Sequence, residues 1–126
     1  LVNDLDLEKN VTFFGDHDAP EKLMSSVTLF VSTSNYEGFG LAVAEAMAAG
    51  IPVIATDSGG VSEVMGDTGC LIPVGDISSL GGEIVSHLEC SDNELISFGF
   101  LGAKRVADNF SEEAWFEKWT SIYKGN

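Results

Sequence analysis

The feature that most constrains the fold is a pair of short apolar runs, within Thr28–Ser32 and Pro52–Ala55, separated by an alanine-rich stretch. An unbroken apolar run is typical of a strand that helices cover on both faces, and parallel neighbours need a crossover between them. The stretch Gly38–Ala49 has a helical composition and ends before a glycine, so we expect a strand, helix, strand unit. The pattern predicts an α/β fold with a parallel sheet.

The same alternation continues on both sides of this unit. We expect further short strands at Val11–Phe14 and Gly69–Val74. Helices are predicted over residues 20–26, 58–63, 76–90, 91–108 and 111–124. Asp76 should cap the helix over 76–90. The apolar face predicted for that helix consists of Leu80, Ile84, Val85 and Leu88.

An aromatic stripe at helical spacing marks the last predicted helix. Its members are Trp115, Phe116, Trp119, Ile122 and Tyr123. Such a stripe normally packs into a core, so we expect it to be buried, with ligand stacking as the alternative.

Two carboxylates and two glycines frame the start of the alanine-rich helix. Gly38 and Gly40 allow backbone N–H groups to approach a ligand, and a helix N-terminus attracts an anion. Because Glu37 and Glu45 would repel a diphosphate, they should accept hydrogen bonds from hydroxyl groups instead. A nucleotide sugar supplies both a diphosphate for the N–H groups and hydroxyl groups for the two acids. Capping of the helix start remains an alternative for Glu37, and a solvated helix face remains one for Glu45.

The stretch Glu37–Val53 resembles the E-x7-E signature of the retaining family 4, or group 1, glycosyltransferases, which have the GT-B fold. Roughly two thirds of the chain carries the likeness. It extends through Val11–Gly15, Leu29–Ser34, Ser58–Gly60, Glu63–Gly66 and Gly69–Pro73.

The resemblance implies a Rossmann-like, three-layer α/β unit that forms the C-terminal half of a GT-B fold. Residues 1–126 would then be a partial donor-binding domain that lacks the N-terminal acceptor domain. In the family the terminal helix can lean on that domain, so the resemblance implies that part of the aromatic stripe is exposed here. The donor-site residues it implies are Glu37, Gly38, Phe39, Gly40, Leu41 and Glu45. Glu37, the catalytic candidate, would contact hexose hydroxyls without transferring a proton, and Glu45 would contact the ribose. The backbone of residues 39–41 would face the hexose and the diphosphate.

The reaction implied for the whole enzyme is transfer of a hexose from a nucleoside diphosphate sugar to an acceptor hydroxyl, with retention and without a metal or a cofactor. Family members carry phosphate-binding cations in a segment that would precede Leu1, so the isolated chain is expected to be inactive. The alternatives are a non-catalytic nucleotide-binding or structural module and a GT-B nucleotide-sugar epimerase.

The net charge, the hydropathy and the cysteines of the chain restrict its partners, its location and its metal or disulfide sites. A net charge of −14 argues against nucleic acid as a partner. No apolar run is long enough to span a membrane, so we expect a cytoplasmic protein, with peripheral membrane attachment an option for the longer enzyme. Cys70 and Cys90 are predicted to be buried thiols, and His17 and His87 have no metal-ligand spacing.

By the resemblance, the chain holds only the third to sixth strands of a sheet ordered 3-2-1-4-5-6. Strand Val11–Phe14 would then lack its neighbours. We expect it either to pair beside Thr28–Ser32 or to leave exposed edges that drive a strand-exchanged or edge-paired homodimer.

Overall fold

The structure is a computed structural model of the 126-residue chain that describes residues 1–16, 19–24 and 26–125. Its sheet has three parallel strands in the order β1 (Phe30–Ser32), β2 (Val53–Thr56) and β3 (Cys70–Ile72). The register pairs Val31 with Ile54, and Ile54 with Cys70. All four residues of the central strand β2 are buried, whereas β1, at one edge, is half-buried. The parallel α/β architecture predicted from the sequence is confirmed.

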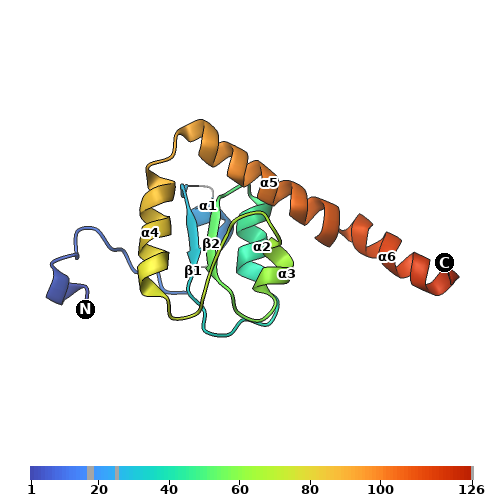
Figure 1. Ribbon diagram of the computed structural model, residues 1–126, viewed down its shortest axis with the longest axis horizontal. Coiled ribbons are helices and arrows are strands. Elements are labelled where there is room, and N and C mark those ends of the chain that lie inside the picture. Colours follow the sequence, from blue (N-terminus) through green and yellow to red (C-terminus); the bar gives the residue numbers. More distant parts are fainter. Residues whose placement is uncertain (17–18, 25, 126) are drawn as a thin grey trace.

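The described residues form six α-helices, most of which flank this sheet (Figure 1). They are α1 (Pro20–Met24), α2 (Leu41–Ala48), α3 (Val61–Met65), α4 (Ile77–Leu88), α5 (Asp92–Phe110) and α6 (Glu112–Lys124), with a short 3-10 helix at Asn3–Leu5. Helix α4 lies on one side of the sheet, and α2 and α3 lie on the other. Helix α5 crosses α2, and α6 continues outward from the body of the molecule. The result is the three-layer arrangement expected from the sequence.

The main core lies between the sheet, α2 and α3. Its largest fully buried side chains are Met47, Met65, Val43, Val61 and Val64. Ile54 of β2 is also fully buried but does not belong to this cluster. Helix α5 approaches α2 closely because Gly99 has no side chain. A Cβ at Gly99 would lie 1.9 Å from the carbonyl oxygen of Gly50.

Local capping chemistry sets the ends of the later helices. The Asp76 side chain accepts a hydrogen bond from the Ser79 amide at 3.0 Å, as predicted. These hydrogen bonds hold the pKa of the exposed Asp76 carboxyl below its ordinary value. At the start of α5, Ser91 and Glu94 form a reciprocal capping box.

The predicted strand Val11–Phe14 is wrong. These residues are irregular, and Phe13 and Phe14 are exposed. In the described part of the chain, β1 pairs only with β2, so residues 11–14 have not moved beside it. A strand of this length needs a hydrogen-bonding neighbour to be stable. Dimerisation through exposed edges remains a prediction.

Two predicted apolar faces also differ from the structure. On α4, Leu80 and Ile84 are half-buried, but Val85 and Leu88 face solvent. On α6, the whole aromatic stripe is exposed, with Trp119 the least exposed member at 40%. Of the described elements, α5 is the main contact of α6. The predicted packing of the stripe into a core is therefore wrong.

Candidate functional site

The candidate site lies at the carboxyl end of β1, where open α/β sheets bind ligands. We call residues 37–41 the glycine loop. They form the last part of the connection from β1 to α2, and the last of them, Leu41, is the first residue of α2. The helix begins at Leu41 rather than at Gly38 as predicted, so Glu37 to Gly40 precede it as an irregular segment.

The turn that carries Gly59 and Gly60 lies directly against the glycine loop. The Gly60 amide donates to the carbonyl oxygens of Glu37, at 3.2 Å, and Gly38, at 3.1 Å. A Cβ at Gly59 would lie 1.7 Å from the Glu37 carbonyl oxygen, and one at Gly60 would lie 2.5 Å from that of Gly38. Both positions therefore require glycine for this close backbone contact.

The side chain of Glu37 contacts one hydroxyl group at the edge of the sheet, that of Ser34, and Thr56 in turn holds Ser34. The Ser34 hydroxyl donates to the Glu37 carboxylate at 3.5 Å, which is a long hydrogen bond. Buried Thr56, the last residue of β2, donates its hydroxyl to the Ser34 carbonyl at 2.6 Å. This chain of contacts links the central strand to the candidate carboxylate. Glu37 itself is half-buried and can still be reached by a ligand.

Gly40 shapes the N-terminus of α2. Its φ is +87°, in the left-handed region, and a Cβ there would lie 3.2 Å from Val61. Its carbonyl accepts the Ala44 amide at 2.9 Å and so starts the helix. Among the described residues, no backbone group accepts the amides of Phe39, Gly40 or Leu41. These three N–H groups can therefore bind an anion.

Glu45 lies on the second turn of α2 and is exposed. It has no hydrogen-bonded or ion-paired side-chain partner in the described part of the chain. Because the helix starts at Leu41, Glu45 is about 6 Å along the axis from the helix start, at roughly 1.5 Å per residue. The two acids are thus placed on the loop and on the helix that follows it.

Sequence reasoning missed the aromatic support of the loop. Phe39 is 44% exposed, and its ring meets that of Phe110, at the end of α5, edge to face with centroids 5.5 Å apart. Seventy-one positions separate the two rings in the chain, and no local pattern connects them. A cavity of about 230 Å³ lies at the carboxyl ends of the strands, with Thr33, Asn35 and Thr56 in its lining, but none of residues 37–41 lines it.

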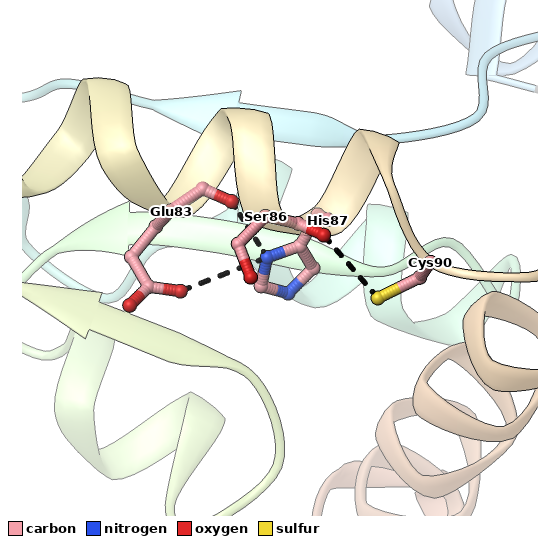
Figure 2. Close-up of polar contacts among 4 residues, drawn as sticks. All are labelled: Glu83, Ser86, His87 and Cys90. Carbon is pink, nitrogen blue, oxygen red and sulfur yellow. Dashed lines mark hydrogen bonds and ion pairs between the residues drawn. The ribbon is translucent and has the colours of Figure 1, made fainter.

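A second polar cluster lies on α4, away from the glycine loop (Figure 2). His87 Nδ1 hydrogen-bonds to the Glu83 carbonyl at 2.9 Å and is 3.8 Å from the Glu83 carboxylate. The Cys90 thiol donates to the Ser86 carbonyl at 3.4 Å. Burial, and then the Glu83 carboxylate, raise the pKa of the Cys70 thiol above its ordinary value.

Both cysteines are free thiols and half-buried rather than fully buried. In residues 1–16, 19–24 and 26–125, no three potential ligands form a metal site. His17 lies outside the described residues. The helices in that part of the chain are also too short or too polar to cross a membrane.

Comparisons with known proteins agree with this architecture. The family described as glycosyl transferases group 1 matches residues 1–90. The N-acetyl-alpha-D-glucosaminyl L-malate synthase of Bacillus anthracis is 36% identical over 98% of the chain, which spans 32% of that protein.

Solved structures of similar proteins have the same architecture. Anabaena HepE in complex with UDP and glucose matches 99% of the chain with a TM-score of 0.85 and 25% identity, over 35% of its own length. The C-terminal domain of a group 1 glycosyl transferase from Francisella tularensis matches 88% of the chain with a TM-score of 0.73 and 26% identity, over 59% of its length. The chain therefore spans about a third of the first two proteins.

Proposed function

Because the chain belongs to the group 1 glycosyl transferases, we propose that it is the donor-binding part of a retaining enzyme that moves a hexose from a nucleoside diphosphate sugar to an acceptor hydroxyl. The observation that carries this proposal is the set of three unpaired amides at residues 39–41, next to the half-buried Glu37. The acceptor-binding groups would lie on polypeptide outside these residues.

Each element of the site has a distinct role in the proposal. The amides of the glycine loop face the diphosphate, whose negative charge grows as the bond to the hexose breaks. Preorganised donors stabilise that charge more in the transition state than in the ground state. Glu37 accepts hydrogen bonds from hexose hydroxyls, and Glu45 accepts them from the ribose. The proposal assigns neither residue a proton transfer and includes no metal or cofactor.

Two comparisons support this choice. The Anabaena protein was solved with UDP and glucose, which makes UDP the natural first probe. The Francisella relative is named a glycosyl transferase, which favours transfer over epimerisation. A net charge of −14 opposes any anionic ligand, so we expect the 126-residue chain to bind UDP weakly.

The test is an NMR titration of the ¹⁵N-labelled chain with UDP, GDP and ADP, since NMR detects millimolar binding. We expect the largest shifts at the amides of residues 39–41 and around Glu45. Shifts confined to other surfaces, or none at 10 mM nucleotide, would overturn the proposal.

The ribose assignment is tested by Glu45→Gln, with Glu89→Gln as a control that changes the charge equally at an exposed site just after α4. We expect Glu45→Gln to weaken UDP binding and Glu89→Gln to leave it unchanged. The two variants should then bind 2′,3′-dideoxyuridine diphosphate equally, because that ligand has no ribose hydroxyls to lose. A Glu45→Gln defect that persists with the dideoxy ligand would refute the assignment.

A further inference from the structure

Arg105, on α5, reaches across to the C-terminal end of α3. Its Nε donates to the Val64 carbonyl at 2.7 Å, and one terminal nitrogen donates to the Glu63 carbonyl at 2.7 Å. Forty-one positions separate Arg105 from Val64. Hydrogen bonds from a charged group to the last carbonyls of a helix are stronger than neutral ones, and a cation there also complements the helix dipole.

Gly66 leaves the space that the Arg105 guanidinium group occupies. Gly66, the residue after α3, has a φ of +53°, which side-chain-bearing residues rarely adopt. A Cβ at Gly66 would lie 2.3 Å from Arg105 Cζ. Because the two donors are used in a fork, a lysine could replace only one of them.

The opposite end of α3 holds the glycine loop. Gly60 is the N-cap of α3, and its amide makes the two hydrogen bonds to the loop carbonyls described above. Five residues of helix span only about 7.5 Å, so α3 moves as one rigid piece. A shift at its C-terminal end therefore reaches the loop.

Helix α5 also contacts the loop directly, through Phe110, whose ring packs on Phe39. Arg105 and Phe110 both lie beyond residue 90, where the family match ends. The neighbouring Lys104 points elsewhere and pairs with Asp108 on the exposed side of the helix. The contact with α3 is thus specific to position 105.

We propose that Arg105 is a positioning residue of the donor site: by holding the C-terminal carbonyls of α3, it keeps Gly60 against the glycine loop and so aligns the loop amides with the diphosphate. This inference rests on the proposed function for its ligand. Its structural half, the coupling of Arg105 to the loop, can be measured without nucleotide.

The experiment compares Arg105→Met with Lys104→Met. Both remove one positive charge from adjacent positions of the same helix, so general electrostatics are matched. Hydrogen exchange of the Gly60 amide, followed by NMR without ligand, should become faster in Arg105→Met and stay unchanged in Lys104→Met. The UDP dissociation constant should rise about tenfold in Arg105→Met, within the range that remote residues produce. Arg105→Lys should give an intermediate value.

A separate variant distinguishes positioning from general stability. Val53→Ala removes buried methyl groups at the opposite end of β2 and should lower the melting temperature while leaving the UDP dissociation constant unchanged. If Arg105→Met does not fold, Arg105→Lys supplies both readouts.

The outcomes separate the two proposals. If the wild-type chain shows no UDP shifts at the loop, the proposed function fails, and the Gly60 exchange rate still decides the coupling. If wild type binds UDP but Arg105→Met binds it equally well, the positioning role is refuted. Equal weakening of UDP binding by Val53→Ala and Arg105→Met would also refute it, since stability alone would then explain both.

Discussion

Replacing Gly59 with alanine should damage both the fold and the site, whereas the same change at Gly50 should damage the fold alone. Both glycines have a left-handed backbone, with φ of +57° and +75°. They differ in what a methyl group would meet. At Gly59 it would lie 1.7 Å from the Glu37 carbonyl oxygen, and at Gly50 it would have nothing within 4 Å. The pair therefore isolates the contact with the glycine loop.

The expected losses follow from two separate costs. A left-handed conformation costs an alanine about 1–2 kcal/mol, which both variants incur. Overpacking against rigid structure adds about 1–3 kcal/mol, which only Gly59→Ala incurs because the opposing atom is backbone. We expect Gly50→Ala to lower the free energy of unfolding by about 1–2 kcal/mol and Gly59→Ala to lower it by about 2–5 kcal/mol.

The same clash should also weaken nucleotide binding. To relieve the clash, the Glu37 carbonyl must retreat by more than about 1 Å, a misplacement that can cost a site two orders of magnitude in activity. Urea unfolding measures the stabilities, and NMR titration with UDP measures the affinities. UDP binding should weaken at least tenfold in Gly59→Ala and stay unchanged in Gly50→Ala. Equal stability losses, or wild-type UDP affinity in Gly59→Ala, would refute the reasoning.

Two further predictions concern packing and thiol chemistry. Gly99→Ala should lower the free energy of unfolding by about 1–3 kcal/mol, because its methyl group would meet the Gly50 carbonyl. Gly82→Ala, in open space on α4, should instead raise the free energy of unfolding by about 0.5–1 kcal/mol. Urea unfolding measures both changes. The raised pKa of Cys70 leaves less thiolate at a given pH. Because the Glu83 carboxylate contributes to that shift, Glu83→Gln should lower the pKa and move the pH midpoint of iodoacetamide alkylation downward. An unmoved midpoint, read by mass spectrometry, would contradict the assigned cause.

The helix boundaries show what local chemistry can predict. The helices expected over 76–90, 91–108 and 111–124 end within about two residues of α4, α5 and α6. Their caps are Asp76, Ser91 and Ser111, each of which accepts an amide hydrogen bond from a residue three positions later. Such contacts close within a single turn, so the sequence alone contains them.

Burial was less predictable than secondary structure. Residues 11–14 have the composition of a strand but no neighbouring strand to pair with. The α6 stripe has the periodicity of a core-facing helix, yet its helix extends away from the sheet (Figure 1). In both cases the local sequence has the pattern of a buried strand or helix, but none of the described elements buries it.

From residue 20 onward the sequence by itself determined the order of strands and helices, the glycines that precede α2, and the identities of the two acids, because each depends on residues close together in the chain. Only the tertiary structure decided what holds the glycine loop in place. The Gly59–Gly60 turn contacts the loop, the hydroxyl of Thr56 holds Ser34 just before it, and the guanidinium of Arg105 holds its supporting helix, in each case from 22 or more positions away. Contacts of that kind depend on how the layers pack, and no local spacing encodes them.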